Sequence, residues 1–197
     1  MTQSIELFLE FRSPYTYLAL TQLSAMDLDI ALRPVDLHKV MKLVGNVPTS
    51  LTCEPKGRYA RVDLERWATR SGVSFNPSNM SANDADACSR AVLAATTSDD
   101  ALTVALTLFR ALWSEAKTLA NADDVVAALA DADIDLATIK SRIDSPEMFE
   151  KYIANTNEAA RRGVFGSPTI FVGDAMFFGN DRLDFVREEL ARLEMAA

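Results

Sequence analysis

Alternating apolar and polar residues mark a first strand near the start of this chain. Residues 5–11 read Ile-Glu-Leu-Phe-Leu-Glu-Phe, with apolar side chains at every second position, which is the period of a strand with one strongly apolar face. Ser13 and Pro14 follow and predict a helix start, because serine is a good N-cap and proline suits the first helical position. A second strand over residues 29–36 would complete a right-handed βαβ unit with parallel strands.

The middle of the chain, residues 38–162, has almost no strand pattern and a succession of helix patterns. The most distinct predicted helix covers residues 54–71 and ends at Gly72, since glycine commonly terminates helices. Further helices are predicted over about residues 82–97, from residue 98 to about 120, after an Asn121 cap, over 135–142, and from Ser145-Pro146 to Gly163.

Strand patterns return after Gly163. Two short strands are predicted over residues 169–172 and 175–178 with a hairpin turn between them, and Asn180 or Asp181 would cap a final helix. The order βαβ … ββα predicts an α/β protein with a thioredoxin-like fold and a large all-helical insertion. The thioredoxin-like domain would comprise residues 1–37 and 163–197, and the helical insertion domain residues 38–162.

The charge of the chain limits its partners. A net charge of −8 argues against sequence-independent nucleic-acid binding and against anionic membranes, both of which need a basic surface. No apolar stretch is long enough to span a bilayer. The first residues lack the basic start and long apolar core of a secretory signal, so we expect a cytoplasmic protein.

The cysteine and histidine content favours neither a disulfide nor a metal site. Cys53 and Cys88 form no Cys-x-x-Cys pair, and two reduced thiols are favoured over a long-range disulfide. His38 is the single histidine and lies in no cluster of ligands, so we expect no metal and a surface or capping role for His38.

Ser13 is the first candidate for chemistry. It lies on a strand-to-helix turn that, in a thioredoxin-type site, would face the X-Pro loop at Ser167-Pro168, and it stands where a redox protein has cysteine. A hydroxyl cannot form a disulfide, but together with a helix N-terminus it can stabilise a thiolate from another molecule. Lowering a thiol pKa by about two units requires about 2.7 kcal/mol. The alternatives are that Ser13 only caps the helix, or that it is a nucleophile, for which no base is evident.

Five segments together carry a family resemblance. They are residues 11–19, Gly45-Asn46, residues 56–59 with 63–67, residues 163–169 and residues 178–183. The chain resembles the 2-hydroxychromene-2-carboxylate isomerases, which are close relatives of the kappa-class glutathione transferases within the DsbA-like group. The resemblance implies a glutathione-dependent enzyme, usually a homodimer, that converts a bicyclic aromatic catabolite into trans-o-hydroxybenzylidenepyruvate or a related product.

The thioredoxin-type fold and the resemblance also imply a glutathione site. Pro168 would follow a cis bond, and the main chain of Ser167 would pair with the cysteinyl part of glutathione like an added strand. The family usually has an apolar residue at position 167, so this serine is a departure. The γ-glutamyl end would be held by the turn Phe178, Gly179, Asn180 and Asp181, with Asp181 facing the ammonium.

The implied aromatic substrate carries a carboxylate and needs a cation. Lys42 or Lys56 would provide it, and Asn46 and Tyr59 would form hydrogen bonds to its oxygen atoms. The family lysine aligns with Met41, one position from Lys42. Arg12 would either attract the carboxylates of glutathione or face water.

Two other functions remain open at this point. A kappa-like glutathione transferase would use Ser13 in the same way but would release a conjugate. A redox-inactive, thioredoxin-like module would bind peptides along Ser167-Pro168 without any preference for a thiolate. Disulfide oxidoreductase activity is disfavoured, because neither Ser13 nor Thr16 can carry the electrons.

Overall fold

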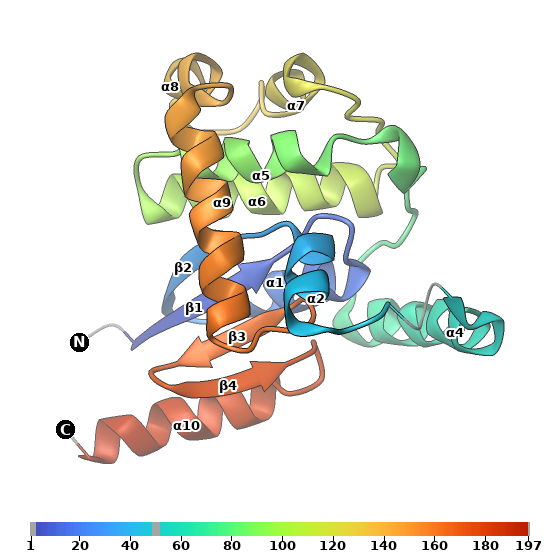
Figure 1. Ribbon diagram of the computed structural model, residues 1–197, viewed down its shortest axis with the longest axis vertical. Coiled ribbons are helices and arrows are strands. Elements are labelled where there is room, and N and C mark those ends of the chain that lie inside the picture. Colours follow the sequence, from blue (N-terminus) through green and yellow to red (C-terminus); the bar gives the residue numbers. More distant parts are fainter. Residues whose placement is uncertain (1–2, 49–51, 197) are drawn as a thin grey trace.

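A single four-stranded mixed sheet forms the centre of the computed structural model, which describes residues 3–48 and 52–196. Its strands are β1 (Gln3–Leu9), β2 (Leu28–Pro34), β3 (Thr169–Val172) and β4 (Ala175–Phe178), in the order β2-β1-β3-β4 (Figure 1). β1 runs parallel to β2 and antiparallel to β3, and β3 runs antiparallel to β4. This arrangement confirms the predicted thioredoxin-like fold, and the last two strands have the predicted bounds.

Helices fill the segment between β2 and β3. In chain order the helices of the structure are α1 (Pro14–Leu23), α2 (Leu37–Val44), α4 (Glu54–Ser71), the short 3-10 helix Met80–Ala82, α5 (Ala85–Ala94), α6 (Ser98–Trp113), α7 (Ala122–Ala128), α8 (Leu136–Arg142), α9 (Pro146–Arg161) and α10 (Leu183–Ala196). The bounds predicted for α4 are confirmed, and no strand occurs within the described part of residues 38–162.

Several predicted helix ends are wrong. α5 is shorter than residues 82–97, because its cap is Asp84 and it stops at Ala94. α6 stops at Trp113 instead of about residue 120, and Thr97 caps it one residue before the predicted Ser98. α10 begins at Leu183, so Asn180 and Asp181 belong to the preceding turn and do not cap it. α2, a short helix that Asp36 caps through a hydrogen bond from the Lys39 amide, was not predicted.

Both faces of the sheet are covered. Ile5, Leu7 and Leu9 of β1 belong to the larger core cluster, which includes residues of α1, α5, α6 and α10. Phe8 points to the other face and packs with Phe171 in a second cluster beneath α2 and α9. The sequence pattern suggested one strongly apolar face for β1; because β1 is a central strand, its second face is buried as well.

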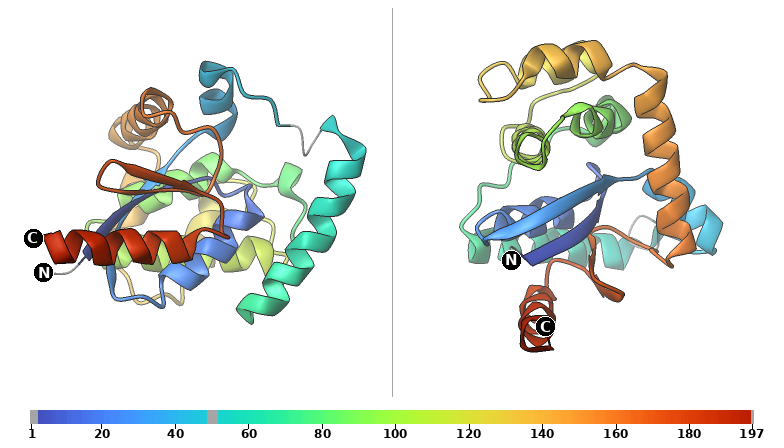
Figure 2. Two further views of the ribbon diagram at one scale, coloured as in Figure 1. Left: turned by 90° about the horizontal axis from the view of Figure 1, so that it is seen from below. Right: turned by 90° about the vertical axis from the view of Figure 1, so that its left-hand side faces the viewer.

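Helix α9 connects the helical block with the sheet. It runs from α8 back to the sheet and packs against both α5 and α2 (Figures 1 and 2). The hydroxyl of Thr156 in α9 accepts a hydrogen bond from the Asp36 amide. The domain boundaries at 37/38 and 162/163 stay a prediction, and the two parts share this long helix.

Cys53 and Cys88 are both free and form no disulfide. Cys88 is buried in α5, where burial raises its pKa, and Cys53 is partly buried at the N-terminus of α4; both are free. Over residues 3–48 and 52–196, no helix is both long and apolar enough to cross a membrane. The same residues contain no group of three or more histidine, cysteine or acidic side chains placed to hold a metal.

Candidate active site

Ser13 forms the centre of the candidate site. It follows β1 in an extended conformation (φ −95°, ψ 109°) and caps α1, accepting a hydrogen bond from the Thr16 amide at 3.3 Å. Its hydroxyl donates to the carbonyl oxygen of Ser167 at 2.8 Å. The strand-to-helix turn and the X-Pro loop, 154 residues apart in sequence, therefore meet at this hydroxyl, as the sequence predicts.

The Ser167-Pro168 peptide bond is cis, which confirms that prediction. Ser167 is 8% exposed, and its hydroxyl lies 2.8 Å from the hydroxyl of Thr16, which is fully buried. A serine in place of the family's usual apolar residue therefore has a hydrogen-bonding partner on α1. Sequence reasoning missed Thr16, although its position one helical turn after Ser13 puts both hydroxyls on the same side of α1.

The turn after β4 lies against the same loop. The Gly179 amide donates to the Pro168 carbonyl at 3.0 Å. Gly179 has φ +100°, and a Cβ there would lie 2.6 Å from Oδ1 of Asp181, so the turn requires glycine. A Cβ on Gly166 would lie 2.4 Å from the ring of Phe178, which explains the glycine before Ser167.

Asn180 and Asp181 line an open cavity of about 490 Å³. Its other walls come from α1, α4 and α10, and they include Arg70 and Arg187. Asp181 pairs with Arg182, and Asn180 is buried with its Nδ2 lacking a partner among the described residues. The volume lies within the range of small-molecule sites, and the wall carries charges of both signs.

Tyr15 connects this region with α4. Its hydroxyl donates to Asp63 at 3.0 Å, and burial together with this bond raises its pKa. Tyr59 and Asp181 lie close enough to Tyr15 to act on it electrostatically. The candidate site is therefore bounded by α1, α4, the cis-proline loop and the turn after β4. Tyr15 and Asp63 are a pair that sequence reasoning did not identify.

Comparison with known proteins identifies the family. The 2-hydroxychromene-2-carboxylate isomerase of Sphingobium xenophagum is 30% identical over 198 residues, covering 96% of this chain and 99% of the relative. The enzyme of the same name from Pseudomonas putida is 31% identical, covering 96% and 95%. The family model for the DSBA-like thioredoxin domain matches residues 4–191. The chain belongs to the 2-hydroxychromene-2-carboxylate isomerase family of DSBA-like thioredoxin domains.

Solved structures agree with this family assignment. A selenomethionine 2-hydroxychromene-2-carboxylate isomerase has a TM-score of 0.85 and 29% identity, covering 97% of this chain and 96% of that one. The cytosolic disulfide reductase DsbM of Pseudomonas aeruginosa has a TM-score of 0.65 and 16% identity, covering 98% of both chains. At 16% identity, the similarity to DsbM shows only a shared DSBA-like fold.

The residues predicted to contact the substrate differ in their exposure and in their hydrogen-bonding partners. Asn46 donates from Nδ2 to the Phe165 carbonyl at 2.7 Å, which fixes the end of α2 to the loop that precedes Ser167. Tyr59 is 63% exposed on α4. Lys42 and Lys56 are both exposed, one in the last turn of α2 and one in the first turn of α4. The choice between the two lysines stays a prediction.

Arg12 forms ion pairs that the sequence did not predict, and its attraction for the carboxylates of glutathione stays a prediction. It pairs with Glu10 at 3.2 Å and with Asp86 of α5 at 2.8 Å, and its Nη1 donates to Nδ1 of the exposed His38 at 3.3 Å. Tyr152 of α9 donates to the same Asp86 oxygen. Arg12 thus joins the turn that carries Ser13 to the helical block. Glu10 is 1% exposed, and burial raises its pKa against the opposing effect of Arg12.

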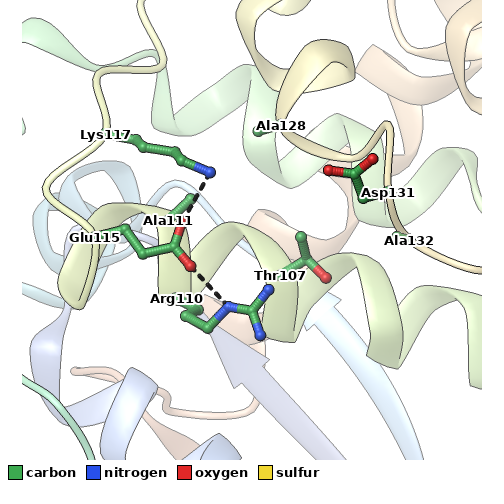
Figure 3. A pocket seen from close by; sticks show the side chains of 8 residues that line it. All are labelled: Thr107, Arg110, Ala111, Glu115, Lys117, Ala128, Asp131 and Ala132. Carbon is green, nitrogen blue, oxygen red and sulfur yellow. Dashed lines mark ion pairs between the residues drawn. The ribbon is translucent and has the colours of Figure 1, made fainter.

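A second cavity lies between α6 and α7, far along the helical block from β4 (Figures 1 and 3). Arg110 and Lys117 on its wall both pair with Glu115, at 3.0 and 2.8 Å. Its volume is about 100 Å³, which is small for a bicyclic ligand. None of the predicted site residues lines it, so we place the candidate active site at Ser13.

Proposed function

We propose that this protein is a glutathione-dependent isomerase that converts 2-hydroxychromene-2-carboxylate, or a related bicyclic aromatic catabolite, to trans-o-hydroxybenzylidenepyruvate. The observation that carries the proposal is the position of the Ser13 hydroxyl at the N-terminus of α1, opposite the cis-proline loop. The near full-length relatives named as this isomerase support the reaction.

The residues present fit glutathione. Ser13 offers a hydroxyl donor, and the Ser167 carbonyl offers a main-chain acceptor beside it. Asp181 and the cavity that it lines, whose wall carries both acidic and basic side chains, suit the ammonium and carboxylate of a γ-glutamyl group. When bound, glutathione would supply a nucleophilic sulfur that adds to the substrate, permits bond rotation and leaves unchanged.

The protein's own contribution is electrostatic. A thiol with a pKa of about 8.5 is only a few per cent ionised at neutral pH. The Ser13 hydroxyl and the N-terminal amides of α1 both favour a negative charge at the sulfur. Lys42 or Lys56 would attract the substrate carboxylate, and Asn46 and Tyr59 would form hydrogen bonds to substrate oxygens. A homodimer and a cytoplasmic location belong to the same proposal.

Turnover with a glutathione balance tests this function. Wild-type protein should isomerise 2-hydroxychromene-2-carboxylate only when glutathione is present, and all of the glutathione should be recovered free. Ser13→Ala should lower kcat/KM at least tenfold, since charge-assisted hydrogen bonds are worth about 1.5–3 kcal/mol. Consumption of glutathione into a conjugate would indicate a transferase, and turnover without glutathione would refute the proposal.

A further inference from the structure

One arginine on the wall of the cavity beside Asp181 has no carboxylate partner. Arg187 pairs with Asp184 at 2.7 Å, and Asp181 pairs with Arg182. Arg70, in the last turn of α4, forms no ion pair and no hydrogen bond with any of the described residues. The other charges on this wall are therefore compensated, whereas the charge of Arg70 suits one further anion.

The guanidinium of Arg70 rests on an aromatic ring. It lies over the indole of Trp67, 5.4 Å from the ring centroid, one helical turn earlier on α4. This cation–π contact restricts the side chain, but it satisfies none of the five N–H donors of the guanidinium with an acceptor. The donors of Arg70 therefore stay available to a ligand in the cavity.

A second donor on the same wall also lacks an acceptor. Asn180 is 4% exposed, and its Nδ2 has no hydrogen-bonding partner in the described part of the chain. A buried donor without an acceptor is unfavourable, so a ligand oxygen at this position is stabilised. A carboxylate suits both donors, because it has two acceptor oxygens and matches the planar fork of a guanidinium.

We infer that Arg70 binds the α-carboxylate of the γ-glutamyl group of glutathione, with Asn180 as a second donor. This inference rests on the proposed function and names the side chain that recognises one end of the thiol. The γ-glutamyl ammonium stays with Asp181, which lines the same cavity. Arg70 is thus a specificity-determining residue that favours thiols with a free α-carboxylate at this end.

Two analogues of glutathione separate the carboxylate from the ammonium. In the first, a 4-aminobutanoyl group replaces the γ-glutamyl group, which removes the α-carboxylate and keeps the ammonium. In the second, a glutaryl group removes the ammonium and keeps the carboxylate. Calorimetry measures the dissociation constant of glutathione and of each analogue in a buffer that contains neither phosphate nor a carboxylate.

The proteins compared are wild type, Arg70→Gln and a matched control, Arg61→Gln. Arg61 is exposed and does not line the cavity. It lies nine positions before Arg70 on α4, on the opposite side of the helix, since each residue turns an α-helix by about 100°. The two substitutions remove the same charge from the same helix.

Arg70→Gln should weaken the binding of glutathione and of the glutaryl analogue about tenfold, because a hydrogen bond between charged groups is worth about this factor. The 4-aminobutanoyl analogue should bind to wild type and to Arg70→Gln within about twofold, since it lacks the group that Arg70 contacts. Arg70→Lys should recover part of the affinity for glutathione, because lysine keeps the charge but not the planar fork.

An equal loss of affinity for glutathione and for the 4-aminobutanoyl analogue would overturn the inference, because Arg70 would then act only through the packing of α4. A loss for glutathione no larger than that caused by Arg61→Gln would overturn it as well. Neither result would affect the proposed function, which fails separately if wild-type protein binds glutathione but does not isomerise the substrate.

Discussion

The hydrogen bond between Thr16 and Ser167 allows a quantitative test of how the two halves of the site are joined. The perturbation is a double-mutant cycle of Thr16→Val, Ser167→Ala and the double variant. Thr16 is fully buried and Ser167 is 8% exposed, and their hydroxyl oxygens lie 2.8 Å apart. Each single substitution leaves the remaining hydroxyl buried without its partner.

The expected magnitudes follow from this burial. A buried hydroxyl left without a partner costs about 1–3 kcal/mol, so each single variant should be destabilised by that amount. Removing both hydroxyls leaves no unpaired group, so the double variant should have nearly the unfolding free energy of wild type. The two substitutions should therefore be non-additive by about 1–3 kcal/mol, in the direction that makes the double variant more stable than the sum of the single variants predicts.

Chemical denaturation followed by circular dichroism measures the four unfolding free energies. Thr103→Val in α6 is the matched control, because no hydrogen bond of its hydroxyl is found among the described residues, and it should change stability by less than about 0.5 kcal/mol. Additive effects of Thr16→Val and Ser167→Ala would refute the reasoning, since they would mean that the two hydroxyls do not satisfy each other.

Three further predictions concern the surroundings of the site. Trp113→Phe should cost about 1–3 kcal/mol of unfolding free energy, because Nε1 donates to the buried Phe11 carbonyl at 2.9 Å; Trp67→Phe, whose ring nitrogen has no partner in the described part of the chain, should cost less than half as much. Glu10→Gln should change the pH dependence of stability: the folded-state pKa of Glu10 lies above its ordinary value of 4.5, so its contribution is fully present below pH 4.5 and is lost as pH rises through the folded pKa. Chemical denaturation at a series of pH values should show that the unfolding free energy of wild type falls relative to that of Glu10→Gln between acid and neutral pH. An equal pH dependence of the two unfolding free energies would contradict a raised Glu10 pKa. Gly179→Ala should weaken glutathione binding at least tenfold by calorimetry, because its φ is +100° and its Cβ would collide with Asp181; Gly173→Ala has φ +57° and no atom near its Cβ, and should bind glutathione normally.

The regular elements of the fold could be predicted from local patterns. Proline after serine predicted the start of α1, and glycine after a helix predicted the end of α4. A β-branched run followed by a hairpin turn predicted both C-terminal strands, because such signals act over a few residues. The helix ends in the alanine-rich block were less predictable. Alanine has a high helix propensity, so an alanine-rich sequence does not mark where a helix ends. At the end of α6 the carbonyls of Leu112 and Trp113 accept hydrogen bonds from the amides of Ser78 and Asn76, which are remote in sequence.

The site was predictable only where its residues lie in turns with a defined geometry. Ser13, Pro168 and Gly179 are such residues. The contacts of Thr16, Tyr15 and Arg12 were not predicted, because their partners are remote in sequence: Ser167 for Thr16, Asp63 for Tyr15 and Asp86 for Arg12. A local sequence pattern does not predict contacts between residues that come together only in the folded chain.

Ultraviolet titration of bound glutathione tests the central claim, that a hydroxyl at the start of α1 keeps a ligand's sulfur ionised. With wild-type protein, thiolate absorbance should rise about two pH units below the free thiol pKa of about 8.5. With Ser13→Ala at saturating glutathione, the rise should return toward that of the free thiol. Identical titration curves for the two proteins would contradict the account.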